Sequence, residues 1–334
     1  MKNMVDRTNP IAFKIENMRS FRTLCILGLV VGAWFAYFLG VKNSVDSSSL
    51  DEIGAMPNGF HQPWSGLGHK HVNGLHPPSD QNGEPTEEDF EVFLKKVNPS
   101  NDWLIALDPN ESQSLLRDPG MMGLAVKDYL PKLGVTRFSV TNPKLAFPFF
   151  ERFLKDDHIS INHPLRIPLP PRDLVHTEES SFSDSFIDWM GGEVGRTGFG
   201  KGVKLALLDS GVNSSHPFLN GAQIHHRNML DQASGSTDEV ANAHGTALAS
   251  VIAGNTESYQ GIAPGCEILS YQVIDASGLA DSFTVATAVI AAVEDGAGVI
   301  NLSLGAEQGS SVLRDAISYA LSRDVIVVAA TGNE

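Results

Sequence analysis

The longest uninterrupted apolar stretch lies near the N-terminus, at residues 24–41. As a helix it would span about 27 Å, close to the ~30 Å hydrocarbon core of a bilayer. Because the stretch is apolar on every face, a buried core helix is disfavoured. Basic residues outnumber acidic ones in residues 1–23, so the positive-inside rule places that region in the cytoplasm. An uncleaved signal anchor and a cleaved signal peptide both remain open, although the length of the stretch and the lack of an A-x-A site favour the anchor.

Residues 42–85 have the composition of a flexible linker. They are rich in Ser, Gly, Pro, Asn and His and poor in β-branched residues, so they cannot bury much apolar surface. Four histidines lie here, but their spacing matches no common pattern of metal ligands: His61, His69, His71 and His76. We therefore interpret this region as a solvated tether.

Periodic patterns resume at Thr86 and predict a small α/β domain over residues 86–170. Pro119-Gly120 interrupts the second of its expected helices, and Pro148 lies near the first turn of the third. The expected order is a helix at 86–97, a strand at 102–108, helical spacing at 115–133, a strand at 135–140, a helix at 145–157 and an extended segment at 158–169. By itself this pattern indicates no function.

From Gly202 onward, apolar runs alternate with helical patterns. Such repeated β–α units predict a parallel sheet with helices on both faces, in which ligands bind at the carboxyl ends of the strands. The expected strands lie within 203–212, 267–274, 298–305 and 325–334, and the expected helices within 243–254, 281–296 and 311–324.

Four polar residues lie at the ends of these strands or at the start of a helix, which are places where ligands bind in such sheets. Asp209, Ser303 and Asn333 each come at or just after the end of an expected strand, and His244 opens a helix. A carboxylate that orients an imidazole, an imidazole that removes a proton and an amide that donates to an oxyanion together suit acyl transfer. Taken singly, each residue also has a plainer interpretation as a helix cap, a turn residue or an ordinary strand residue.

The motifs around these residues resemble those of the subtilase family of serine proteases (peptidase S8). They are DSG at 209–211, HGTALASVIAG at 244–254, SLG at 303–305 and TGN at 331–333, and the resemblance covers residues 186–334. It implies a subtilisin-like fold that is incomplete in this chain. It also implies that Asp209 and His244 belong to the catalytic triad, that Asn333 lines the oxyanion hole, and that Ser303, Leu304 and Gly305 bind the substrate backbone.

The same resemblance gives the small domain a role. Subtilases often carry an N-terminal prosegment that assists folding and inhibits the active site, and residues 86–170 resemble one in position, size and element order. Processing would then fall between Pro170 and Ser185, in a linker at 171–185, with the catalytic domain beginning at residue 186. The partners implied are polypeptide substrates and the protein's own prosegment.

The sequence departs from the family in one respect. The G-T-S-x-A-x-P motif that carries the nucleophilic serine is absent, and the sequence ends one residue after Asn333. We therefore expect the front part of an endopeptidase precursor that is inactive alone, whose residues 186–334 fold poorly by themselves. The alternative is a catalytically inactive, subtilase-derived binding or decoy protein that truly ends at residue 334.

Charge and cysteine content narrow the possible partners and covalent cross-links of the protein. The formal charge of −15 argues against nucleic acid as a partner. A disulfide between Cys25 and Cys266 is not expected, and Cys266 suits a small buried position after Pro264 rather than a nucleophile. No cofactor is required and no metal ligands are identified, although the resemblance allows a structural calcium ion that the sequence does not locate. We expect an enzyme that is either membrane-anchored through residues 24–41, with its catalytic domain extracytoplasmic, or secreted.

Overall fold

The computed structural model describes residues 87–154, 158–167, 198–230, 243–256, 259–306 and 308–330. The predicted membrane segment at 24–41, the linker at 42–85 and the processing region at 171–185 lie outside these ranges. Among the residues described, no helix combines the length and apolarity needed to cross a membrane. The chain divides into two compact units, one ending at Asn162 and the other comprising the described residues from His163 onward.

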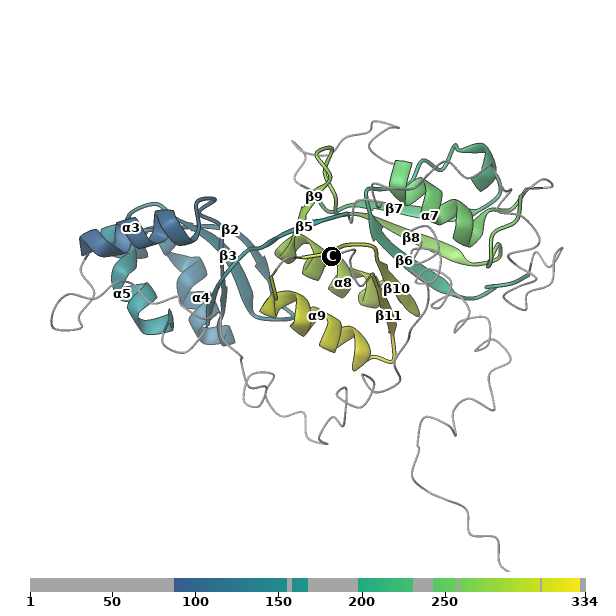
Figure 1. Cartoon of the computed structure of the whole chain (residues 1–334). Coiled ribbons are helices and arrows are strands. Elements are labelled where there is room, and N and C mark those ends of the chain that lie inside the picture. Colours follow the sequence, from purple (N-terminus) through teal and green to yellow (C-terminus); the bar gives the residue numbers. More distant parts are fainter. Residues whose placement is uncertain are drawn as a thin grey trace, which may run out of the picture. The chain divides into compact units, whose positions relative to one another are not determined.

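The first unit pairs three helices with an antiparallel sheet of strand order β2-β3-β1-β4 (Figure 1). In chain order its elements are α3 (Glu87–Val97), β1 (Trp103–Ala106), α4 (Pro109–Arg117), the 3₁₀ helix η2 (Pro119–Met122), β2 (Leu124–Leu130), β3 (Val135–Val140), α5 (Pro143–Leu154) and β4 (Ile159–Ile161).

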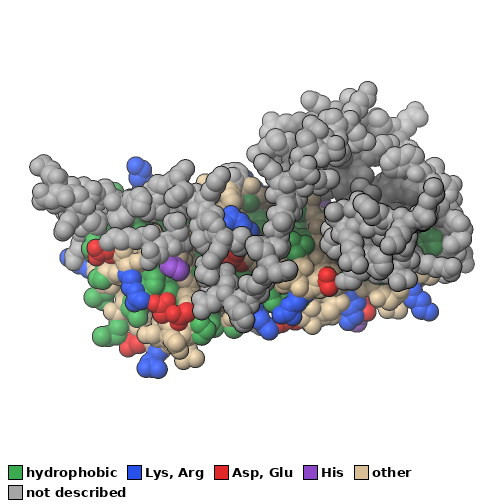
Figure 2. All heavy atoms as spheres, turned by 90° about the horizontal axis from the view of Figure 1, so that it is seen from below, with side chains coloured by type: hydrophobic (Ala, Val, Ile, Leu, Met, Phe, Trp, Pro, Cys, Tyr) green, Lys and Arg blue, Asp and Glu red, His purple; other side chains and the backbone are tan. Residues whose placement is uncertain are grey.

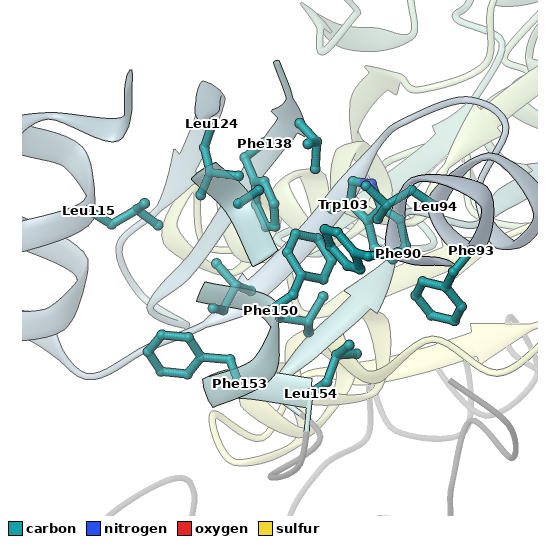
Figure 3. Close-up of a cluster of buried hydrophobic side chains, with 14 of the residues drawn as sticks. Phe90, Phe93, Leu94, Trp103, Leu115, Leu124, Phe138, Phe150, Phe153 and Leu154 are labelled. Atoms are coloured by element: carbon teal, nitrogen blue, oxygen red, sulfur yellow. The ribbon is translucent and has the colours of Figure 1, made fainter. Parts of the chain in front are cut away.

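Aromatic side chains form the core of this unit. Phe90, Trp103, Phe138 and Phe150 are fully buried. The ring of Phe150 meets those of Phe90 and Trp103 edge-on, with centroids 5.2 Å apart in both pairs. Figure 3 shows these rings converging from the helices and the sheet. Edge-to-face packing adds to the free energy gained by burying the rings.

The expectation of helical structure over 115–133 is wrong in its second half. The chain turns at Gly123, whose φ is +66° and whose carbonyl accepts hydrogen bonds from the amides of Thr141 and Asn142. A Cβ at this position would lie 2.3 Å from the carbonyl oxygen of Asn142, so only glycine fits. Residues 124–130 then form β2, because pairing with β3 buries Leu124 at one end and Leu130 at the other.

The third helix of this unit also begins earlier than expected. Asn142 caps α5 by accepting hydrogen bonds from the amides of Lys144 and Leu145, so the helix starts at Pro143. Pro148 consequently lies inside the helix rather than in its first turn. Phe150 and Phe153, on the core side of α5, remain buried.

The second unit is built on a five-stranded parallel sheet of order β11-β10-β6-β8-β7. In chain order its elements are β5 (Pro164–Arg166), β6 (Lys204–Asp209), the 3₁₀ helix η3 (Pro217–Leu219), β7 (Gln223–Asn228), α7 (Ala243–Ala253), β8 (Glu267–Gln272), β9 (Leu279–Asp281), α8 (Ser282–Glu294), β10 (Val299–Leu302), α9 (Ser311–Leu321) and β11 (Ile326–Ala329).

Helices cover both faces of this sheet, as predicted. Leu205 and Leu207 on β6 pack with Leu248 and Ile252 of α7, while α8 and α9 lie on the opposite face (Figure 1). Side chains alternate between the two faces along a strand, so β6 is apolar almost throughout because both faces are covered. This arrangement places β6 in the centre of the sheet and Asp209 at its carboxyl end.

Charged side chains show no segregation on the face of the molecule in Figure 2. Basic and acidic side chains of the described residues are interspersed there. The described side chains visible in this view therefore form no basic patch of the kind that binds phosphate backbones.

Candidate active site

His244 and Asp209 form a hydrogen-bonded pair at the carboxyl end of the central strand. The Nδ1 atom of His244 lies 2.8 Å from Oδ1 and 2.9 Å from Oδ2 of Asp209. Asp209 is fully buried, and its Oδ1 also accepts a hydrogen bond of 2.7 Å from the amide of Ser210. An Nδ1–H that donates to a fixed carboxylate leaves Nε2 as the basic nitrogen of the ring.

The electrostatics of the pair favour the protonated imidazole. Burial alone would lower the pKa of His244, but the hydrogen bond and the negative charge of Asp209 outweigh burial and raise it above its usual value of 6.5. A base with a raised pKa holds a proton more firmly and so stabilises the imidazolium formed when it removes a proton from a nucleophile.

Hydrogen bonds join the loop after β6 to successive residues at the start of α7. Beside the Asp209–His244 pair, the amide of Gly245 donates to Oγ of Ser210 at 3.2 Å. At the next residue of α7, the amide of Asn213 donates to Oγ1 of Thr246 at 2.8 Å. The D-S-G and H-G-T motifs therefore fix each other, although they lie 35 residues apart in sequence.

Backbone hydrogen bonds from the segment after β8 also hold the end of the central strand β6 in place. The carbonyl oxygen of Asp209 accepts hydrogen bonds from the amides of Val273 and Ile274, at 2.9 and 3.3 Å. These residues directly follow β8, which pairs with β6 along its whole length. The carboxylate therefore projects from a backbone position that adjacent strands hold in place.

The predicted substrate-binding residues follow β10 directly. Ser303 is buried, and its Oγ accepts a hydrogen bond of 2.9 Å from Nδ2 of Asn301. Leu304 is also buried, and Gly305 exchanges two backbone hydrogen bonds with Arg166. Because Leu302 pairs with Leu208, Ser303 follows β10 at the level where Asp209 ends β6. The structure thus brings Ser303 and Asp209 to the same edge of the sheet, whereas Asn333 lies outside the described residues.

Sequence reasoning did not identify two contributors to this site. The first is Gly245, whose contact with the DSG loop could be suspected only from its place in the histidine motif. The second is β5, which lies between β9 and Gly305. Its only sequence signal was extended spacing, which does not show which strands it would pair with.

The structure also bears on the predicted role of Cys266 and on possible metal sites. Cys266 is buried, and burial raises the pKa of its thiol to about 12, so it remains a thiol at neutral pH. Over the parts of the chain that the structure describes, no three His, Cys, Asp or Glu side chains are grouped so that they could hold a metal ion.

Comparison with known proteins shows what the region around this site resembles. The sequence profile described as "Subtilase family" matches residues 200–334. Residues 200–334 are thus similar to the subtilase family of serine proteases. Thermitase of Thermoactinomyces vulgaris is 39% identical to this chain over 137 residues, which are 40% of this chain and 48% of thermitase. Subtilisin Savinase of Lederbergia lenta is 40% identical over 136 residues, 40% of this chain and 49% of Savinase.

The chain thus spans about half the length of the curated subtilases that it matches. A solved structure of the epidermin leader peptide processing serine protease from Staphylococcus aureus superimposes with a TM-score of 0.52. That match covers 70% of this chain and 60% of the other at 21% sequence identity, so it shows a shared fold alone. The likeness in fold therefore reaches beyond the 135-residue match at 200–334.

Proposed function

We propose that the protein to which this chain belongs is a serine endopeptidase made as a precursor. The observation that carries the proposal is the hydrogen-bonded pair of His244 and buried Asp209 at the carboxyl end of β6, within a subtilase domain. A carboxylate that orients a histidine at this edge of a parallel sheet suits general base catalysis of peptide-bond hydrolysis.

In the proposed reaction, Nε2 of His244 removes the proton from a serine hydroxyl as that oxygen attacks the scissile carbonyl. Asp209 holds the imidazole in the required tautomer and stabilises the imidazolium. His244 then donates the proton to the departing amine. We place the nucleophilic serine outside residues 1–334, and we assign the side-chain amide of Asn333 to the oxyanion that forms during attack.

Substrate would bind as an added strand along Ser303, Leu304 and Gly305. The pairing of Arg166 with Gly305 supports this, because a segment of the chain already uses that backbone as a strand partner. The segment follows the small domain, so we propose that residues 86–170 serve as a prosegment that inhibits the enzyme intramolecularly. The fold match over 70% of the chain is consistent with such a two-part precursor.

The remaining features of the proposal come from the sequence. The enzyme would act on the extracytoplasmic side of a membrane, anchored through residues 24–41 or released after processing. The reaction needs no cofactor, and a calcium ion would have a structural role only.

The test is hydrolysis of a fluorogenic peptide library and labelling by a fluorophosphonate probe, using the full-length protein. We expect His244→Ala to reduce kcat on the order of 10⁶-fold and Asp209→Asn by about 10⁴-fold, as in other triads of this type. The control is His225→Ala, because the side chain of His225 is largely exposed on β7 and should not affect kcat.

Absence of both labelling and hydrolysis in the unmodified protein would overturn the proposal. The alternative function, an inactive subtilase-derived binding protein, would then be favoured. In that case the His244→Ala protein would bind peptides as well as the unmodified protein does.

A further inference from the structure

A polar pair lies buried in the parallel sheet, on the strand next to the one that ends at Asp209. Asn301 on β10 and Ser303 directly after that strand are each 2% exposed, and Nδ2 of Asn301 donates to Oγ of Ser303 at 2.9 Å. Burying an amide side chain costs free energy, which one hydrogen bond offsets only in part. At the same level of the sheet β6 carries Leu207. Apolar packing alone therefore does not account for the asparagine.

The register of β10 and β6 places this polar pair on the same face of the sheet as the candidate catalytic pair. Val299 pairs with Leu205, and both belong to the apolar cluster that α7 covers. Residues two apart along a strand share a face, so Asn301 and then Ser303 follow Val299 on that face. On β6 the same count leads from Leu205 to Asp209, whose carboxylate contacts the start of α7.

Ser303 is therefore the neighbour of Asp209 on the adjacent strand. Leu302 pairs with Leu208, so the next residues of the two chains, Ser303 and Asp209, come level with each other. The backbones of neighbouring strands lie about 4.8 Å apart. The amide of Ala330 donates to the carbonyl of Leu302 at 3.1 Å, so β10 stays bonded to its other neighbour up to the residue before Ser303. A displacement of Ser303 would thus occur directly beside the carboxylate of the candidate site.

The side chain of Asn301 fixes Ser303 from within its own strand. Strand β10 ends at Leu302, so beyond that residue the pairing with β6 no longer holds the chain. The hydrogen bond from Asn301 reaches past Leu302 to the first residue outside the strand. A bond between two side chains on one face restricts the rotamers of both residues. The fixed part of the chain is thereby extended by one position, to the level of Asp209.

We propose that Asn301 is a positioning residue for the candidate active site and that it acts through Ser303. The proposal rests on the proposed protease function, in which substrate binds along residues 303–305, and it names a further residue on which that same site depends. With the hydrogen bond in place, the backbone of Ser303 stays level with Asp209, so the scissile bond of a bound peptide is aligned with the base. Asn301 is itself buried within the sheet and would act without touching substrate.

The first test measures the hydrolysis of a fluorogenic peptide by the full-length protein and by its Asn301→Leu variant. Without the hydrogen bond Ser303 is free to shift, and a misplacement of about 1 Å can cost on the order of 100-fold in rate. We expect kcat to fall by about 10- to 100-fold. KM should change little, because Leu304 and Gly305 still bind the peptide. An unchanged kcat would overturn the proposal.

Ser270→Ala is the matched control for this substitution. Ser270 is also 2% exposed, and it pairs with Leu207 from β8 at the level where Asn301 pairs with Leu207 from β10. It therefore removes a buried polar group from the same layer of the sheet on the side away from Ser303. We expect kcat of Ser270→Ala to equal that of the unmodified protein. A loss as large as that of Asn301→Leu would mean that any buried polar group in this layer has the same effect, and would overturn the proposal.

A double-mutant cycle separates positioning from a purely structural role. Ser303→Ala leaves the amide of Asn301 buried without its partner and should lower the midpoint of urea unfolding. Combining Ser303→Ala with Asn301→Leu replaces both partners by apolar groups and should recover most of that stability. Because either substitution removes the same hydrogen bond, kcat of the double variant should stay as low as that of Asn301→Leu. Recovery of kcat together with stability would show a structural role alone and overturn the proposal.

A further measurement does not depend on activity. In Asn301→Leu, amide hydrogen exchange should become faster in the segment that contains Ser303 and Leu304, whereas Ser270→Ala should leave that segment unchanged. Unaltered exchange in Asn301→Leu would defeat the proposal whether or not the protein cleaves peptides. Faster exchange, combined with no fluorophosphonate labelling of the unmodified protein, would count against the proposed function and not against the hold of Asn301 on Ser303. Failures of the two proposals are therefore distinguishable.

Discussion

Gly245, the residue after the candidate base, lies against the carbonyl oxygen of Gly211 with no room for a side chain. A Cβ on Gly245 would lie 2.2 Å from that oxygen and 3.2 Å from Oδ1 of Asp209. Contacts under 3.0 Å to backbone atoms can be relieved only if the backbone moves. The glycine in the histidine motif therefore sets how closely α7 approaches the DSG loop.

We expect Gly245→Ala to destabilise the second unit by about 1–3 kcal/mol, the usual cost of overpacking. It should also displace His244 from Asp209, because the clash pushes the start of α7 away. Urea unfolding and the NMR shift of the His244 ring would measure the two effects. Gly309→Ala is the control, since no atom lies within 4 Å of a Cβ placed there; equal stability of the two variants would contradict the prediction.

Asp209→Asn should lower the pKa of His244. The charge and hydrogen bond of Asp209 raise that pKa against the effect of burial, so removing the charge leaves burial dominant. NMR titration would then place the His244 midpoint below that of the unmodified protein. In the active enzyme, the rise of kcat with pH would shift in the same direction, since only the neutral imidazole acts as a base.

The same shift has a consequence for stability. A folded-state pKa above the unfolded value adds stability that is fully present below about pH 6.5 and is lost as pH rises through the folded pKa. Comparison of the unmodified and Asp209→Asn proteins from pH 5 to pH 9 would show this loss. A stability difference that grew with pH over this range would contradict the assignment.

Asp102 is expected to stabilise the first unit through a buried ionic network. Its carboxylate accepts two hydrogen bonds from Nε and one from Nη2 of Arg137, and one from Nδ2 of Asn162, with Lys127 also within 3.3 Å. Burial alone would raise the pKa of Asp102, but these partners lower it below its usual value of 3.8. The stability it adds is therefore present above pH 3.8 and lost as pH falls through the folded pKa.

Asp102→Asn should accordingly cost about 3 kcal/mol at pH 7, because Arg137 would keep its charge without its buried partner. Hydrogen exchange of β1 and β3 at pH 7 would report the loss, and the variant should be less sensitive to acid than the unmodified protein. Glu91→Gln, which alters an exposed pair with Lys95, serves as the control and should leave exchange unchanged.

Phe150→Ala should destabilise the first unit by about 3–5 kcal/mol, since the ring is fully buried among other aromatic rings. Val92→Ala, at a position on α3 that is 62% exposed, should change stability by less than about 0.5 kcal/mol. Urea unfolding followed by hydrogen exchange in β1 would separate the two variants. If they were equally stable, the aromatic cluster would not be the core of this unit.

The structure was predicted best from the sequence in segments that combine an apolar pattern with a catalytic motif. The run at 203–212 and the helical pattern at 243–254 correspond to β6 and α7, because both elements are buried almost throughout. Their predicted polar residues, Asp209 and His244, lie within hydrogen-bonding distance. The catalytic roles given to these two residues, and that of Asn333, remain predictions.

Other elements had no comparable local signal. Strand β7 has the sequence QIHHRN and is mostly exposed at the edge of the sheet, so it lacks an apolar run. Strand β9 is only three residues long, and its pairing with β5 joins residues more than 100 positions apart. Periodicity within a short window carries no information about such distant partners, so neither the edge strand β7 nor the pairing of β5 with β9 could be predicted.

The central position of β6 ties the candidate site to the cooperative unfolding of its whole domain. With β10 and β11 on one side and β8 and β7 on the other, β6 cannot separate without breaking two rows of parallel pairing. Local openings of lower free energy would involve the peripheral strands instead. Tags, fluorophores or inserted loops attached near β7 should therefore leave the geometry of Asp209 intact, which makes that edge the natural place for reporters of substrate binding.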